Sequence, residues 1–107
     1  MIAATFAALL ATSTADLVQD RTIAARNAYT ACLRRFMARS VEERATLAAF
    51  ETALPQQCTT EEQAMRAAII AREPAANRAQ AEEDATLEVQ DARDNIKQVF
   101  DISITPR

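Results

Sequence analysis

Apolar side chains recur along the chain in steps of three and four residues, the spacing that places them on one face of an α-helix. Such a stripe starts soon after Asp16 and predicts a first helix that ends near Ala38. Its members are Val18, Thr22, Ala25, Tyr29, Cys32 and Phe36. We expect this face to be buried, because an amphipathic helix of a small protein packs through its apolar stripe.

A second helix is predicted over residues 41–54. Ser40 starts the motif S-V-E-E, in which its hydroxyl can accept from the backbone N–H of Glu43 while the Glu43 carboxylate reaches back, forming a capping box. The buried face would consist of Leu47, Phe50 and Leu54. Pro55 should end this helix, because the residue before a proline is pushed away from helical geometry.

A third helix is predicted to start at the motif C-T-T-E-E-Q. Thr59 can form a capping box with Glu62. Thr60 offers the alternative box, with Gln63. Acidic residues in the first turn also suit the positive end of the helix dipole.

The stripe that follows keeps its phase across Pro74. It runs through Ala64, Ala68, Ala71, Ala75, Arg78, Glu82, Ala85, Val89, Ala92, Ile96 and Val99. The unbroken phase favours one long helix over residues 60–101 with a kink at Pro74, where the missing hydrogen bond costs roughly 3 kcal/mol. The polar positions Arg78 and Glu82 favour a break instead. The kinked helix is the preferred prediction, and a break is the alternative.

The composition indicates an all-α fold. The 107 residues include no glycine, alanine is the commonest residue, and much of the remainder consists of other strong helix formers. β-Branched residues do not alternate over the length of a strand, except in the tail DISITPR. We therefore predict a small bundle of three to four helices, with two shorter helices packed on a long helix kinked or broken at Pro74.

Residues 1–15 have features of a signal peptide. The chain has no charged side chain before Asp16, and residues 2–11 are almost wholly apolar, which suits a signal core and is too short to span a bilayer. Ser13 and Ala15 stand at the −3 and −1 positions of a small-x-small site, so cleavage is predicted between Ala15 and Asp16. Residues 16–107 would then form a single helical domain with no stable membrane anchor. The alternative is an apolar first helix of the bundle, because no Lys or Arg precedes the apolar core.

Cys32 and Cys58 are the two cysteines. In an exported chain, a single pair predicts one intramolecular disulfide, which would stabilise the fold by about 3.5 kcal/mol on the chain-entropy model. The alternatives are two buried thiols in a cytosolic protein, or a redox or metal site. A zinc site would lack histidine partners, and the C-x-x-C spacing of a thiol redox site is absent.

Several function classes are disfavoured by what the chain lacks. Without histidine or glycine, the usual general base and any glycine-rich phosphate loop are missing. Carboxylates stand next to one another in three groups, Glu42–Glu43, Glu61–Glu62 and Glu82–Glu83–Asp84, but adjacent residues on a helix point in different directions. The net charge of −3 disfavours nucleic acid as a partner. We expect no enzyme, no metal and no cofactor.

Charge is unevenly distributed along the chain. Residues 21–39 contain five arginines and no acid, whereas residues 82–94 contain six acids and a single arginine, Arg93. Both segments can be solvated faces of separate helices. Alternatively, the first and last helices pack as neighbours and opposite charges meet along their edges, where each exposed pair contributes about 0–1 kcal/mol.

The segment TTEEQAMRAAII, residues 59–70, resembles the L-T-x-x-Q motif of the bacterial periplasmic stress chaperones that form helical hairpins. Thr60 and Gln63 match the motif, Thr59 stands where leucine is expected, and no second copy is present. The resemblance covers a dozen residues and is not taken as membership of that family. It implies an exported helical protein that holds unfolded client proteins.

Two functions are therefore considered. The first is a structural or protein-interaction module of the bacterial periplasm, with an unidentified protein partner or a second copy bound through helix faces. The second is a chaperone-like client binder. The first keeps its apolar stripes buried or within an interface, whereas the second exposes a large apolar patch.

We predict export with cleavage after Ala15. Mass spectrometry of the protein from its native host should find the N-terminus at Asp16. The substitutions Leu9→Arg and Leu10→Arg together should block export, because the translocation machinery reads the apolar core. Recovery of the unaltered chain from the cytoplasm, still starting at Met1, would contradict this prediction.

Overall fold

The computed structural model describes the backbone of residues 3–106, and the side chains of residue 17 and of residues 20–106. Within this part the chain forms four α-helices and two short 3-10 helices, and no strand. They are α1 (Ala3–Glu42), α2 (Leu47–Ala53), η1 (Leu54–Gln56), α3 (Thr59–Ala71), η2 (Ala75–Asn77) and α4 (Arg78–Ile104). The all-α prediction is confirmed.

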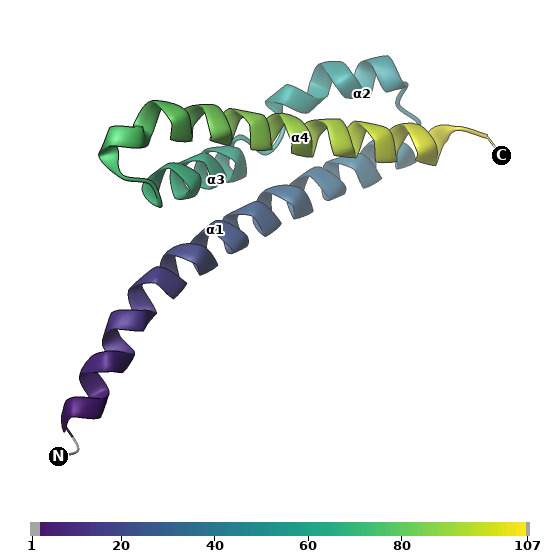
Figure 1. The fold of residues 1–107 in the computed structure, drawn as a ribbon. Coiled ribbons are helices and arrows are strands. Elements are labelled where there is room, and N and C mark those ends of the chain that lie inside the picture. Colours follow the sequence, from purple (N-terminus) through teal and green to yellow (C-terminus); the bar gives the residue numbers. More distant parts are fainter. Residues whose placement is uncertain (1–2, 107) are drawn as a thin grey trace.

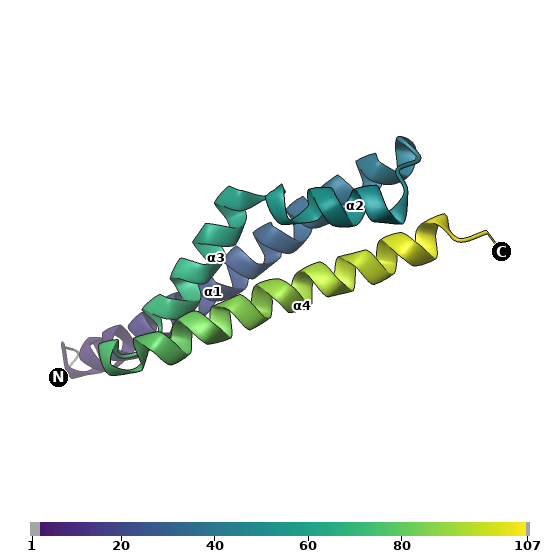
Figure 2. The same cartoon turned by 90° about the horizontal axis from the view of Figure 1, so that it is seen from above.

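The helices form three arms (Figure 1). α1 and α4 run in the same direction. α2 and α3, which come between them in the sequence, together form a middle arm that runs in the opposite direction. α3 packs on both α1 and α4 over one half of the bundle, and α2 packs on α4 over the other half. Figure 2 shows that α2 and α3 lie on the same side of α4.

The core follows this arrangement from end to end. Its fully buried members come from all three arms, and they include Tyr29, Leu33, Phe50, Leu54, Met65, Ile69, Ala85, Val89 and Phe100. Phe50 of α2 stacks between Phe36 of α1, at 5.0 Å between ring centroids, and Phe100 of α4, at 4.1 Å. Such stacked pairs contribute beyond their buried area, so the aromatic stack fixes α2 against both long helices.

The first predicted stripe is largely confirmed. Thr22 and Tyr29 are buried, and Ala25, Cys32 and Phe36 are partly buried. The side chain of Val18 lies outside the described residues. In the second predicted face, Phe50 and Leu54 are buried and Leu47 is partly buried.

The predicted boundary between the first and second helices is wrong. α1 continues past Ala38 to Glu42, because Ser40 does not cap a helix: its hydroxyl is buried and donates to the carbonyl of Phe36 at 2.9 Å, a bond that serine can form inside a helix. Arg44 then takes a left-handed conformation, with φ 56°. The chain has no glycine for this position, which glycine usually occupies at a helix end.

α2 starts six residues later than the predicted helix. Its cap is Thr46, whose hydroxyl accepts from the backbone N–H of Ala49 at 3.1 Å. Pro55 does end the α-helix, since the chain continues as the short 3-10 helix η1.

Neither predicted capping box is present at the start of α3. Thr59 is already inside the helix, and the capping position is held by Cys58, with φ 60° and no side-chain capping bond. This left-handed residue costs free energy for any side chain with a Cβ. It allows the chain to turn sharply between η1 and α3.

The preferred kinked helix at Pro74 is also wrong, and the alternative break is confirmed. α3 ends at Ala71, Pro74 is extended with φ −61° and ψ 151°, and α4 starts at Arg78. The turn lets α3 bury Met65 and Ile69 against the two long helices, whereas Ala64 of the predicted stripe is exposed. The phase across Pro74 was therefore a coincidence of alanine spacing.

Replacing Pro74 with alanine should lower the free energy of unfolding by about 0.4–1 kcal/mol. Alanine fits the extended backbone but gives the unfolded chain more freedom. Urea unfolding followed by circular dichroism measures the change, and Pro106→Ala, near the exposed C-terminus, is the control. A gain in helicity and stability in Pro74→Ala would contradict the break.

Candidate interaction surface

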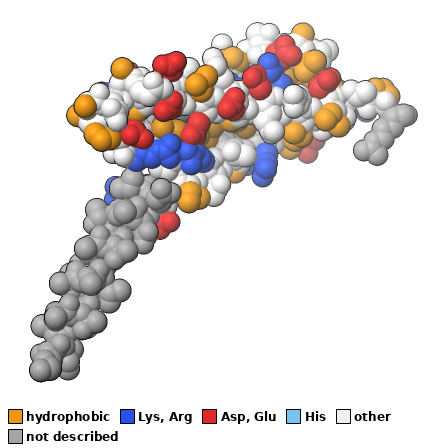
Figure 3. All heavy atoms as spheres, in the orientation of Figure 1, with side chains coloured by type: hydrophobic (Ala, Val, Ile, Leu, Met, Phe, Trp, Pro, Cys, Tyr) orange, Lys and Arg blue, Asp and Glu red, His pale blue; other side chains and the backbone are white. Residues whose placement is uncertain are grey.

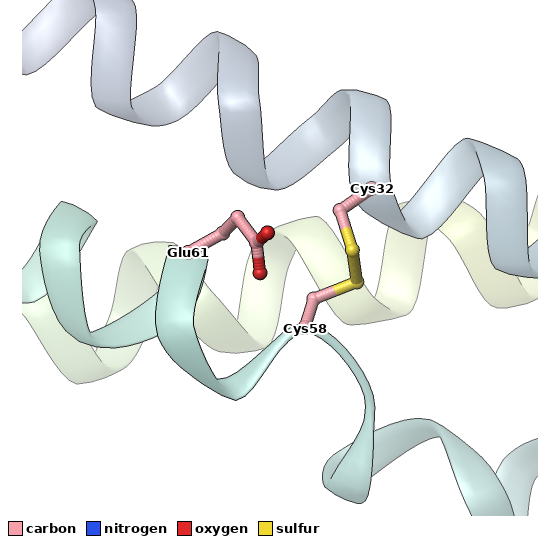
Figure 4. Close-up of side chains that lie close together, drawn as sticks. All are labelled: Cys32, Cys58 and Glu61. Atoms are coloured by element: carbon pink, nitrogen blue, oxygen red, sulfur yellow. A yellow bond between two sulfur atoms is a disulfide. The ribbon is translucent and has the colours of Figure 1, made fainter.

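The structure joins Cys32 and Cys58 in a disulfide, with the sulfurs 2.04 Å apart and the Cα atoms 6.0 Å apart. The Cα separation lies within the usual range for a disulfide. These are the two cysteines whose pairing the sequence predicts. The bond connects α1 to the sharp turn that starts α3 (Figure 4).

The two cysteines meet because the stretch of α1 that follows Cys32 and the segment that returns to Cys58 have similar lengths. The sequence predicts that the first helix ends near Ala38, but α1 continues to Glu42, about ten residues or roughly 15 Å beyond Cys32. The returning segment, residues 47–57, has a similar length and brings Cys58 level with Cys32 again. The bond therefore lies near the middle of the bundle.

Glu61 lies beside the disulfide, with a carboxylate oxygen and both sulfurs within 4.8 Å of one another. Three such groups can resemble a metal site. Thiolates are the form of cysteine that binds metals, and bonded sulfurs are not thiolates. In this oxidised form the cluster offers only the carboxylate to a cation.

The adjacent Glu62 connects α3 to α4. It accepts from Arg66 Nε at 3.0 Å and from Arg93 Nη2 at 2.5 Å, and Arg93 Nη2 also donates to the carbonyl of Pro55 at 3.3 Å. Tyr29 is completely buried close to Arg93, and neither its hydroxyl nor Arg93 Nε has a hydrogen-bond partner among the described residues. Burial raises the pKa of the Tyr29 hydroxyl, and the positive charge of Arg93 opposes part of that effect.

Glu88 connects α4 to α1. Arg26 donates to both oxygens of its carboxylate, from Nε at 2.7 Å and from Nη2 at 2.5 Å, and Arg72 Nη2 lies 3.9 Å away. The bonds from Arg26 lower the pKa of Glu88, and burial opposes this effect. The first and last helices are therefore neighbours, and one of the five arginines of residues 21–39 pairs with an acid of α4.

A groove of about 400 Å³ runs between α1 and α4. Its lining comes from these two helices and from neither α2 nor α3: Thr30, Leu33, Arg34, Met37, Ala92, Asn95, Ile96 and Val99. Most of this lining is apolar. Apolar side chains are also visible along the junction of α4 and α1 in Figure 3.

Exposed apolar residues extend the groove in both directions. Ile23 precedes Thr30 by seven residues, or two helical turns, and its exposed fraction is 49%. On α4, Ile102 follows Asn95 by seven residues and is 71% exposed, while Val99 between them is 39% exposed. Residues seven apart lie on one face of a helix, so Ile23 and Ile102 continue the groove faces of α1 and α4, and Val99 itself lines the groove.

Each edge of the groove carries one sign of charge. Arg34 lines it on the α1 side. On the α4 side, Asp91 is exposed and stands four residues before Asn95, which places it on the same face. Figure 3 shows acidic side chains along α4 and basic ones gathered where α4 meets α1.

The three groups of adjacent carboxylates lie apart from one another and from this groove. Glu42 and Glu43 are exposed at the end of α1. Glu82 pairs with Arg78, one turn earlier in α4, at 3.2 Å. None of these groups lines the groove between α1 and α4.

The predicted cleavage site, Ala15–Asp16, lies within the backbone of α1, and its side chains are outside the described part of the chain. The first buried side chain that the structure describes is Thr22, so the described core belongs entirely to residues 16–107. Cleavage itself stays a prediction. Among the described residues, no helix combines the length and the apolar character that a membrane span requires.

No protein-family model, curated protein or solved structure matches this chain significantly.

The groove was missed in the sequence because its residues follow a second stripe beside the core stripe of each helix. On α4, the positions Glu88, Ala92, Asn95, Val99 and Ile102 follow alternating steps of four and three. The stripe contains polar residues and shares Ala92 and Val99 with the predicted core face. A search for one apolar face per helix therefore merges the two.

Tyr29 is the only tyrosine, and the chain has no tryptophan, so the absorbance of tyrosinate reports this one buried hydroxyl. In the folded protein its titration midpoint should lie above the ordinary value of about 10. The folded state then holds its proton longer than the unfolded state, so stability is retained below pH 10 and falls as the pH rises above it. Tyr29→Phe should remove that part of the pH dependence. Equal midpoints in buffer and in denaturant would contradict the burial of the hydroxyl.

Proposed function

We propose that the protein is a non-enzymatic, exported helical module that binds another protein through the groove between α1 and α4. The observation that carries this proposal is the uncovered face itself. α2 and α3 add no residue to the groove lining, so the apolar side chains of α1 and α4 there have no third helix to cover them.

The form of the groove suits a helix as its occupant. Two roughly parallel helices with an apolar valley between them and charged side chains at the edges can take the apolar face of a further helix. Burying Val99, Met37 and Ile102 would contribute about 25 cal/mol for each Å² removed from water. A groove of this kind recognises a helical partner. Its lining residues do not form an arrangement suited to catalysis.

Export is supported by consistency between two features. The predicted signal peptide leads to an oxidising compartment, where disulfides persist, and the structure contains the disulfide that such a compartment allows. Together they favour the bacterial periplasm as the place of function.

The alternative function is a chaperone-like client binder. It is favoured by the exposed large apolar residues Leu17, Ile23, Leu87, Val99 and Ile102. Val99 lines the groove, and Ile23 and Ile102 lie on helix faces that continue it. Leu17 and Leu87 are single exposed residues, which are normal on any protein surface. The groove therefore favours a specific partner over a general affinity for unfolded chains.

Site-specific crosslinking tests the proposal. A photoreactive residue at Asn95, in the groove, should give a discrete adduct in cells of the native host. The matched control is the same residue at Ala48, which is exposed on α2 and should give none. A smear of many adducts from Asn95 would favour the client binder, and no adduct from Asn95 would contradict the proposal.

A further inference from the structure

We infer that the groove is filled by a second copy of the same chain. Two copies would pack face to face through α1 and α4, related by a two-fold axis parallel to these helices. The inference rests on the proposed function, because it uses the same groove and names its occupant. The first argument is the pattern of the exposed side chains.

α1 and α4 each carry a stripe of residues whose spacing suits packing against further helices. On α1 the stripe contains Ile23, Thr30 and Met37, each seven residues from the next. On α4 it contains Ala92, Asn95, Val99 and Ile102, in alternating steps of three and four. Heptad spacing of this kind lets side chains of one helix enter the gaps of a facing helix. The two stripes of each copy would form one half of a four-helix core.

The second argument is charge. A two-fold interface brings the same surface from both copies together, so this surface must complement itself. Arg26 and Glu88 already pair with each other within the chain. The charges left for a partner are Arg34 on the α1 side of the groove and the exposed Asp91 on the α4 side. A surface with one basic half and one acidic half complements itself when α1 of each copy faces α4 of the other copy.

This condition selects the direction of the axis. An axis parallel to the helices sets α1 on α4 of the second copy and leaves every residue at its own height along the bundle. An axis across the helices would set α1 on α1 and α4 on α4, so that edges of the same charge would face each other. The parallel axis is therefore the favoured one.

Arg34 and Asp91 form the contact that distinguishes this arrangement. Arg34 lines the same groove as Asn95 and Ile96 in its own chain, and a parallel axis would keep it beside this stretch of α4 in the second copy. Side chains on a helix lean toward its N-terminus, which aims Arg34 toward the height of Asp91. Both are exposed, and neither forms an ion pair within the described part of the chain, so their charges are available.

Sedimentation of the oxidised protein, expressed in and purified from its native host, tests the inference. The unaltered chain should sediment as a dimer. Arg34→Asp and Asp91→Arg should each weaken dimerisation by about tenfold, because each change acts at two symmetric contacts and turns attraction into repulsion. The double variant should regain most of the affinity, since the exchanged charges attract again. Arg35→Asp, an adjacent exposed change of the same chemistry off the groove, is the control and should leave the dimer intact.

The outcomes separate this inference from the proposed function. A chain that stays monomeric at about 100 μM, two orders of magnitude above a micromolar Kd, overturns the dimer. If the Asn95 adduct then contains a different protein, the proposed function stands and its partner is heterologous. If the unaltered chain dimerises but the double variant is no tighter than the single variants, the axis is wrong. Circular dichroism of each variant confirms that the fold is retained, as both substituted side chains are exposed.

Discussion

The disulfide between Cys32 and Cys58 is the constraint on which the arrangement of the helices depends. The middle arm is not one helix: it breaks at the left-handed Cys58, and its first part, α2, has only seven residues. A helix of this length is unstable by itself. The bond fastens the break to Cys32 of α1, so that the segment after α2 and the start of α3 are held at one fixed point. Phe50 and Glu62 then hold the two parts of the arm on α4, one by aromatic stacking and the other through Arg93.

The same arrangement explains why one face of the molecule is open. The middle arm covers α1 and α4 from one side only, and the core residues of both long helices turn toward it. The broken arm cannot also cover the opposite side, where the groove runs. The proposed second copy would close that face with its own α1 and α4, since its basic and acidic edges would meet the opposite edges of the groove. The fold and the proposed interface therefore have the same origin: α2 and α3 cover only one side of α1 and α4.

Part of this structure could be predicted from the sequence. The absence of glycine and the apolar stripes indicated an all-α bundle, and the single cysteine pair indicated the disulfide. Helix boundaries were harder, because Ser40 can bond either a following N–H or the carbonyl one turn earlier, and burial against the core decides between them. The turn at Pro74 depended on Met65 and Ile69 reaching the core, which local spacing cannot show. The groove depended on which faces α2 and α3 leave uncovered, a property of the assembled bundle.

Peptide mapping of the protein from its native host tests the central constraint most directly. The protein is unfolded and alkylated without reductant, then digested with trypsin. Cleavage after the arginines that flank each cysteine releases residues 27–34 and residues 45–66. The account predicts that these two peptides are recovered as one disulfide-linked species without an alkyl group. Recovery of both as separate alkylated peptides would contradict it, and with it the oxidising compartment and the fixed return of the chain to α1.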